Sequence, residues 1–434
     1  MRYSGITKAD REQMLRVIGV PTTEALLSSV PEDVRVSSPL DIRGPLGELE
    51  LLRELEQRKV APPRVSLVGG GLYSHYIPKT VDSLAARSEW VTSYTPYQPE
   101  VAQGTLTMYY EFQTYVCMLT GQEIANGGMY DGSTALAEAV LMGLRIRKKS
   151  RRVYVSEGVH PMYREVLATY LRYQDAELVL MPLDPVTGRT SVNVSPEDQG
   201  DAAGVVIQNP NYFGVIEDGE GVSGDAFRIG VCTEAQSLAL LKPLPCDVMV
   251  GEMQSLGIPI QLGGPTSGFF ATKRAYVRNT PGRLVGLSQD RRGREALCIT
   301  LATREQFIRR EKATSNICTA SGLMCLRATI YLSLLGAAGL KSVARQSARA
   351  TQAFQSALLE VGGKRVYSGA NFNEFVVDLS AAPDLYASLK TAGFLLGIPL
   401  GPERPHQYLV ALTEMHYPVI DSLIQEVKKH AHDS

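Results

Sequence analysis

Four segments of the chain carry the glycines, polar side chains and charges from which binding or catalytic sites are usually built. The first is a glycine loop over residues 127–134 that runs directly into a helical pattern. A helix start of this kind presents free backbone N–H groups and the positive end of the helix dipole, which suit a phosphate or a carboxylate. We therefore regard Gly132, Ser133 and Thr134 as candidate anion-binding residues. The alternative is that Asp131, Ser133 or Thr134 only caps the helix.

The second segment, residues 93–104, places two tyrosines, two amides and a carboxylate around two prolines ahead of a predicted helix. Proline restricts the backbone, so the loop can hold these side chains for a ligand at low entropic cost. The alternative is a surface loop whose carboxylate lies in the first turn of the helix. The candidate site residues in this loop are Tyr94, Tyr97, Gln98, Glu100 and Gln103.

The third segment, residues 303–318, is rich in arginine, and its candidate residues are Arg309 and Arg310. Arginine forks suit carboxylates and phosphates. The alternative is a solvated charged face on which Glu305 and Glu311 form local ion pairs.

The fourth segment, residues 251–268, follows an apolar run at which a strand is expected to end. It contains acid, amide and hydroxyl groups but no lysine. In open α/β folds, ligands bind beyond the carboxyl ends of the strands, and this segment lies there. The alternative is a plain connecting loop.

Short apolar runs alternating with helical patterns must position these segments. The runs are apolar on both faces, which favours a parallel or mixed sheet covered on both sides by helices. The connector over 218–226 is unusually short for a helical crossover, so it is expected to hold at most one helical turn. The predicted strands are 152–155, 177–182, 203–208, 227–232, 247–250 and 268–272.

The remaining patterns divide the chain into three predicted parts. Helical spacing over 8–18 and 48–59 predicts a helical arm over 1–65, ahead of a large α/β domain over 66–325. Long helical patterns at 326–335 and 339–361, with a strand at 375–379, predict a smaller C-terminal α+β domain over 326–434.

Composition excludes several classes of protein. The net charge is −1 and the pI is about 6.6, so nothing favours binding of nucleic acid. The six cysteines form no CxxC pair and the histidines no HxxxH pair, so we expect reduced thiols and no metal site. The most apolar stretch, 317–335, is interrupted by Arg327 and predicts a buried helix. With no apolar N-terminal signal, we expect a cytoplasmic protein without a membrane partner.

Several runs, taken in order, resemble glycine dehydrogenase (decarboxylating), the P-protein of the glycine cleavage system. The resemblance is closest to the N-terminal chain (subunit 1, alpha) of the form that is split into two chains. It implies an α/β fold, PLP-dependent transferase fold type I, with a large mixed or parallel sheet of the seven-stranded type and a smaller C-terminal α+β domain. The runs that carry it are 75–78, 94–100, 129–132, 159–161, 209–218, 281–286 and 304–319.

The resemblance also implies where the cofactor lies. In this family PLP captures glycine and acts as the electron sink for decarboxylation, and the aminomethyl group passes to the lipoyl arm of H-protein. The catalytic half carries a lysine that binds PLP, whereas Ser255 takes that position here, and a hydroxyl cannot form a Schiff base. The family's aspartate at the pyridine nitrogen and its stacked histidine align with Thr233 and Glu157. We therefore expect no covalently bound PLP and only a vestigial anion site at 132–134.

The expected function is that of an obligate enzyme subunit in a heterotetramer. Its expected partners are a PLP-bearing subunit 2, lipoylated H-protein and glycine. The 93–104 loop, and after it Arg309 and Arg310, are expected to contribute to the partner's site. Two alternatives stay open: a self-sufficient PLP enzyme that uses Lys242, Lys273 or Lys312, and a non-catalytic scaffold or regulatory homologue.

Overall fold

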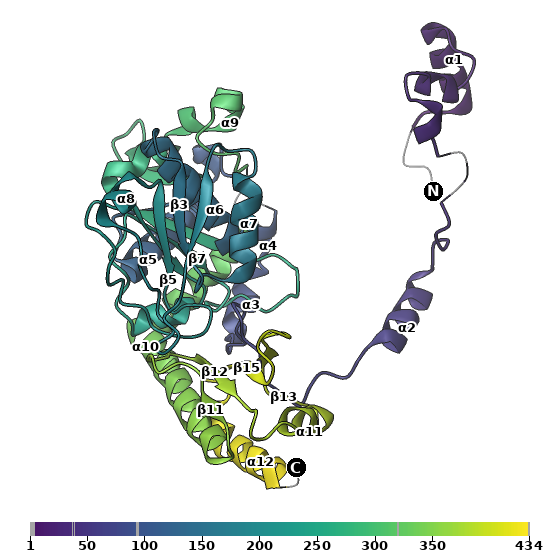
Figure 1. The fold of residues 1–434 in the computed structure, drawn as a ribbon. Coiled ribbons are helices and arrows are strands. Elements are labelled where there is room, and N and C mark those ends of the chain that lie inside the picture. The colour runs from purple at the N-terminus through teal and green to yellow at the C-terminus, as the bar shows by residue number, and fades with distance from the viewer. Residues whose placement is uncertain (1–4, 37, 39, 93–94, 319–320, 433–434) are drawn as a thin grey trace. The chain divides into compact units, whose positions relative to one another are not determined.

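The computed structural model describes residues 5–36, 38, 40–92, 95–318 and 321–432 (Figure 1). The chain divides into two units, Met1–Pro62 and Pro63–Ser434, which are described separately. The candidate residue Tyr94 lies outside the described residues.

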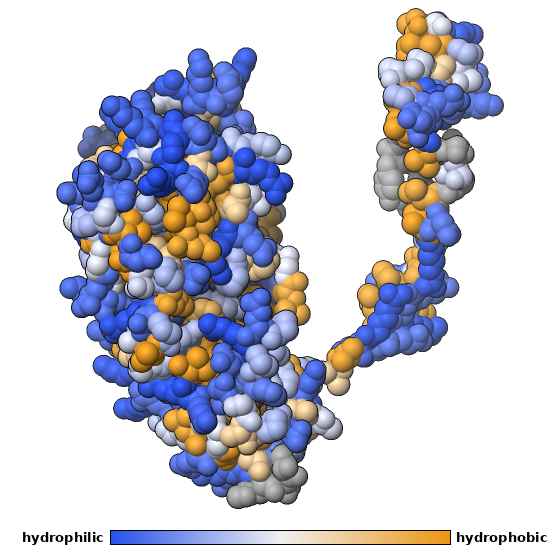
Figure 2. Space-filling model, viewed as in Figure 1, coloured by the Kyte–Doolittle hydropathy of each residue, from blue (hydrophilic) through white to orange (hydrophobic). Residues whose placement is uncertain are grey.

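The first unit is an arm of short helices without a core. Both helices that the periodicity predicts are present. None of its described residues is buried, and apolar side chains such as Leu49, Leu52 and Leu55 are exposed. Apolar patches are visible on this unit in Figure 2. Isolated helices of this length are marginal in water, so these apolar side chains are available for contact with another surface. The elements are α1 (Lys8–Ile18), η1 (Glu24–Leu27), η2 (Glu32–Val34) and α2 (Glu48–Arg58).

A seven-stranded mixed sheet forms the centre of the second unit. Its strand order is β2-β8-β7-β6-β5-β3-β4, in which β3 to β7 run parallel while β8 is antiparallel to both β7 and β2. The six predicted strands are confirmed, and only the short β2 was not predicted. The strands are β2 (Ile124–Ala125), β3 (Arg152–Ser156), β4 (Glu177–Met181), β5 (Gly204–Gln208), β6 (Arg228–Cys232), β7 (Val248–Glu252) and β8 (Gly268–Thr272).

Helices cover both faces of this sheet, as the doubly apolar strands predict. On β7, Val248 and Val250 pack in the core beneath α6 and α7, whereas Met249 packs in the core beneath α3, α5 and α10. This alternation follows the two-residue repeat of a strand. The helices of this part are α3 (Lys79–Ala85), α4 (Ser88–Val91), η3 (Pro99–Val101), α5 (Gln103–Thr120), α6 (Gly132–Ile146), α7 (Pro161–Leu171), α8 (Pro196–Asp201), η4 (Ala235–Ala239) and η5 (Arg274–Asn279).

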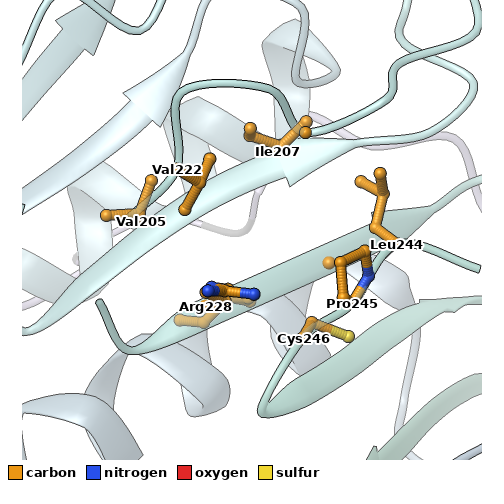
Figure 3. A pocket seen from close by; sticks show the side chains of 10 residues that line it. Val205, Ile207, Val222, Arg228, Leu244, Pro245 and Cys246 are labelled. Atoms are coloured by element: carbon orange, nitrogen blue, oxygen red, sulfur yellow. The ribbon is translucent and has the colours of Figure 1, made fainter. Parts of the chain in front are cut away.

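One connection agrees with expectation and one was not foreseen. The 218–226 connector holds turns but no helical turn. Instead, Val222 and Leu244 cover β5 and β6, and a small cavity of about 30 Å³ remains beneath them (Figure 3). That volume suffices for a water molecule but not for a substrate. The connection that was not foreseen contains an antiparallel hairpin, formed by β9 (Leu284–Gln289) and β10 (Glu295–Thr300).

A second sheet consists of four antiparallel strands, β11-β12-β15-β14, and is covered by α10, α11 and α12. The predicted strand at 375–379 is confirmed as β12. The segment that follows the arm also joins this part, because β1 pairs with β13. The elements are β1 (Val65–Ser66), η6 (Ala302–Arg304), α9 (Gln306–Arg309), η7 (Arg310–Lys312), α10 (Gly322–Glu360), β11 (Lys364–Arg365), β12 (Glu374–Asp378), α11 (Leu385–Thr391), β13 (Phe394–Leu395), β14 (Ile398–Pro399), β15 (Gln407–Ala411), η8 (Tyr417–Val419) and α12 (Ile420–His432).

Helix α10 links the two sheets (Figure 1). Gly336, with φ of 58°, interrupts its helical geometry, which explains why the sequence predicts two helices there. Length and hydropathy alone would allow α10 to cross a membrane. Residues of its first half, among them Leu326 and Tyr331, instead lie in the protein core, as predicted for a buried helix. The predicted domain boundary near residue 325 falls inside α10 and stays a prediction.

Candidate functional site

The start of α6, the predicted anion site, is occupied by groups of the chain itself. Asp131 caps the helix: its Oδ1 accepts hydrogen bonds from the Thr134 backbone N–H at 2.8 Å and from the Ser133 hydroxyl at 2.6 Å. The Gly132 N–H donates to Glu252 Oε2 at 3.1 Å. Ser133 and Thr134 are therefore engaged in capping, which is the alternative that the sequence pattern left open.

Glu252 is the last residue of β7 and is only 4% exposed. Its other carboxyl oxygen accepts hydrogen bonds from the Thr266 hydroxyl and the Met253 N–H. Burial raises the pKa of this carboxyl group to about 7, against the opposing effect of these hydrogen bonds. The sequence shows an acid in this loop, but its position beneath α6 depends on how strand and helix pack.

Ser255 lies three residues beyond Glu252 and is 1% exposed. Its hydroxyl has no hydrogen-bond partner among the described residues, and its carbonyl accepts from the Gln236 side chain at 3.2 Å. Thr233, just after β6, accepts a hydrogen bond from Gln208 at 3.2 Å within the same buried region. Glu157, by contrast, is exposed.

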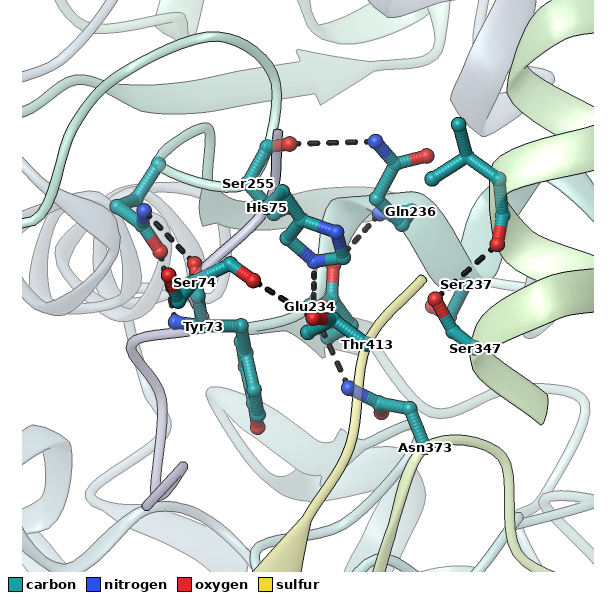
Figure 4. Close-up of polar contacts among 12 residues, drawn as sticks. Tyr73, Ser74, His75, Glu234, Gln236, Ser237, Ser255, Ser347, Asn373 and Thr413 are labelled. Carbon is teal, nitrogen blue, oxygen red and sulfur yellow. Dashed lines mark hydrogen bonds and ion pairs between the residues drawn. The ribbon is translucent and has the colours of Figure 1, made fainter. Parts of the chain in front are cut away.

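A buried charged cluster fills the space next to Ser255 (Figure 4). His75 Nε2 lies 3.1 Å from Glu234 and Nδ1 lies 2.6 Å from Glu414. Burial lowers the pKa of His75, but the two carboxylates outweigh it and raise the pKa to about 10. Glu234 follows the large sheet and Glu414 follows β15, so the imidazolium ties the two sheets together.

A further buried acid, Glu374, reinforces this junction. Glu374 of β12 accepts hydrogen bonds from the Gly70 N–H at 2.7 Å and from the Tyr73 hydroxyl at 2.9 Å. Burial raises its pKa to about 8. The motif at 75–78 and its neighbours thus serve, in this chain, to join two sheets.

These groups make the free energy of unfolding depend on pH. The folded chain holds the protons of Glu252, Glu374 and His75 more tightly than the unfolded chain does. The stabilisation from the two acids is complete below pH 4.5, the ordinary pKa of a glutamate side chain. The contribution of Glu252 is lost as pH rises through about 7, and that of Glu374 as pH rises through about 8. The contribution of His75 is lost between pH 6.5 and about 10.

We expect urea denaturation to give a lower midpoint at pH 9 than at pH 6. Glu374→Gln should flatten the slope below pH 8, and a midpoint that rises with pH would contradict the expectation.

The residues around Ser255 do not fit PLP. None of the three lysines considered as alternative Schiff-base residues is close to Ser255. Lys273 pairs with Asp247 at 2.5 Å, at the opposite end of β7. Lys242 lines a hollow at that same end, and Lys312 is exposed in η7. Ser255 offers a hydroxyl where the resemblance places the Schiff-base lysine, and Glu252 holds the Gly132 N–H that an anion at the start of α6 would need.

The 93–104 loop contributes to a different surface, where four separate segments meet. The Tyr97 hydroxyl accepts a hydrogen bond from Arg283 at 2.9 Å, and the guanidinium lies 5.2 Å from the centre of the Tyr97 ring. Phe307 packs edge-on against Tyr97 at 5.9 Å. Arg283 also donates to the Cys318 carbonyl, and the Cys318 N–H donates to the Tyr130 hydroxyl at 2.9 Å. We call Tyr97, Tyr130, Arg283, Phe307 and Cys318 the loop surface.

The other candidate residues differ in how they relate to the loop surface. Gln98 and Glu100 are exposed beside it. Gln103 is engaged in structure, since its amide exchanges two hydrogen bonds with the backbone of Leu297 in β10, at 2.9 and 3.0 Å. Arg309 and Arg310 are exposed in the same segment as Phe307, with the Arg309 Nε bonded to the Thr303 carbonyl.

Sequence reasoning did not select Arg283, Tyr130 or Phe307 as site residues. All three lie in runs that carry the family resemblance, which is the signal by which they could have been found. Their role in anchoring a distant loop depends on tertiary contacts, which the sequence does not show.

Comparison with known proteins decides the family. A sequence profile described as Glycine cleavage system P-protein matches residues 1–427. The chain belongs to this P-protein family. It is 42% identical to a probable glycine dehydrogenase (decarboxylating) subunit 1 of Solibacter usitatus, covering 96% of this chain and 94% of that one. The corresponding protein of Anaeromyxobacter dehalogenans is also 42% identical, over 98% of each chain.

Solved structures support the P-protein assignment and the fold. A crystal structure of glycine decarboxylase (P-protein) of the glycine cleavage system, in inhibitor-bound form, has a TM-score of 0.84 at 40% identity, covering 99% of this chain and 100% of that one. A sphingosine-1-phosphate lyase of Burkholderia pseudomallei matches with a TM-score of 0.65 at 13% identity, a likeness of fold alone. The predicted fold class, PLP-dependent transferase fold type I, is confirmed.

Proposed function

We propose that this chain is subunit 1 of a two-chain glycine dehydrogenase (decarboxylating) and that it works only with a partner, subunit 2, which carries PLP. The observation that supports this most directly is buried Ser255, which offers a hydroxyl where the family's catalytic chain has its lysine. Relatives that match along their full length are named subunit 1, a name that implies a second subunit. We further propose a cytoplasmic heterotetramer that acts on glycine and on lipoylated H-protein.

In this proposal the loop surface faces the partner's active site. PLP, when bound to the partner, supplies the electron sink for loss of CO2 from glycine. Arg283 holds Tyr97 in place and anchors the backbone at Cys318, so the neighbouring Gln98 and Glu100 are presented from a fixed loop. Tyr94 belongs to the same loop and is proposed to act with them.

The proposed roles follow from the chemistry of each exposed group. The Gln98 amide both donates and accepts hydrogen bonds, which suits the orientation of a substrate. Arg309 and Arg310 carry exposed guanidinium groups that suit a carboxylate such as that of glycine. Gln103 acts as a positioning residue, because its amide docks the hairpin onto α5. By excluding water from the partner's site, the loop surface would also strengthen electrostatic interactions there.

The decisive experiment compares the isolated chain with its mixture with a PLP-bearing partner. We expect glycine–bicarbonate exchange only in the mixture, and no lysine labelled by PLP after borohydride reduction of the isolated chain. A labelled lysine in the isolated chain would instead support a self-sufficient enzyme. Failure to bind the partner would leave the scaffold or regulatory alternative.

A further inference from the structure

A carboxyl group of the chain lies where an anionic ligand would meet the start of α6. The Glu252 side chain enters this position from β7 and accepts the Gly132 N–H. Asp131 accepts the N–H of Thr134 from the other side. Backbone donors at a helix start, which in many folds bind phosphate, are thus used by two side chains of the protein.

The surrounding backbone fixes Glu252 beneath the helix. Met129 and Gly268 exchange two backbone hydrogen bonds, at 2.9 and 3.1 Å, which hold the α6 loop directly against β8. A Cβ atom at Gly268 would lie 2.2 Å from the Asp131 carbonyl oxygen, and one at Gly132 would lie 2.1 Å from the Tyr163 hydroxyl. The loop before α6 therefore packs directly against β8 and α7, and Glu252 lies at this contact.

A second observation concerns the buried loop that follows Glu252. Ser255 Oγ and Gln236 Oε1 are buried, and neither has a hydrogen-bond partner among the residues that the structure describes. Unpartnered buried polar atoms are costly, by about 1–3 kcal/mol each. Both atoms lie in or beside the loop that follows Glu252, because the Gln236 side chain donates to the Ser255 carbonyl, so this buried loop carries polar atoms without a partner.

We propose that Glu252, with Asp131, closes this anion position, so that the chain excludes phosphate-bearing ligands even where no covalent bond to a lysine is required. A phosphate that approached the start of α6 would find the Gly132 N–H already bonded to Glu252 and the Thr134 N–H already bonded to Asp131. Without a lysine at position 255, no covalent bond to PLP can form there. With Glu252 and Asp131 in place, the backbone donors at the start of α6 are not free to bind a phosphate non-covalently. This inference concerns the isolated chain and does not depend on any partner.

The test is phosphate binding by the full-length chain. The double variant Asp131→Ser/Glu252→Ala removes both carboxylates, while serine keeps the helix cap. We expect it to bind inorganic phosphate at least 10-fold more tightly than the unaltered chain, as measured by calorimetry at constant ionic strength with chloride as the reference anion. The matched control Asp131→Ser/Glu252→Gln keeps the position filled and should not gain this affinity. A folded double variant that binds phosphate no better than the unaltered chain would overturn the proposal.

A measurement on the unaltered chain keeps the proposal testable if the variant does not fold. The amide resonance of Gly132 should not respond to inorganic phosphate, because its N–H is already bonded to Glu252. A saturable phosphate-dependent shift of this resonance would overturn the proposal. Since the partner is absent from both experiments, their outcome is independent of whether glycine exchange appears in the mixture.

Discussion

Replacement of His75 with alanine is expected to lower the free energy of unfolding of the chain by about 3–5 kcal/mol. His75 is the only cation among the hydrogen-bond and ion-pair partners of Glu234 and Glu414 that the structure describes, and its side chain is 1% exposed. Its removal leaves two carboxylates buried without a counter-charge at the junction of the two sheets. Urea denaturation at pH 7, monitored by circular dichroism, measures the effect.

Two further variants separate loss of charge compensation from loss of packing. Adding Glu234→Gln to His75→Ala removes one of the stranded charges and should restore part of the lost stability, which a double-mutant cycle would quantify. Lys428→Ala is the matched control, since it breaks an exposed ion pair with Glu360 and should cost at most about 1 kcal/mol. A loss of stability in His75→Ala no larger than that of the control would show that the cluster does not hold the sheets together.

Replacement of Arg283 with alanine is expected to reduce the glycine–bicarbonate exchange of the assembled enzyme by about 100-fold. This side chain contacts both Tyr97 and the Cys318 carbonyl, so without it the 93–104 loop and the arginine-rich segment lose their common anchor. Misplacement of a positioning loop by about 1 Å is enough for an effect of this size. Hydrogen exchange in residues 95–101 should increase in parallel, because the loop is no longer held.

The chemistry of the anchor predicts which substitutions fail. The Arg283→Lys variant should have little more exchange activity than Arg283→Ala, because an ammonium group lacks the planar fork that bonds to two acceptors. Arg151→Ala is the control for loss of one positive charge, because its ion pair with Asp175 lies at the start of β3 and β4, away from the loop surface. Full exchange activity in Arg283→Ala, with the loop still protected, would remove the loop surface from the proposed shared site.

The elements of this protein could be predicted from its amino-acid sequence. The helix Lys8–Ile18 follows from the helical spacing of its residues, and the six main strands follow from short runs that are apolar on both faces. Serine at position 255 is equally a property of the sequence, and it already predicts a chain without a Schiff-base lysine. The hairpin of β9 and β10 was not predicted, since its apolar residues do not alternate regularly.

The tertiary structure decided which residues far apart in the sequence come into contact. Tyr97 and Arg283 are 186 positions apart, and His75 and Glu414 are 339 positions apart. No local pattern encodes such contacts, because they depend on the order of strands in the sheet and on which loops meet at one edge. Glu252 shows this most clearly: the sequence reveals an acid in a loop, and only the packing of β7 against α6 turns that acid into the group that fills a phosphate position.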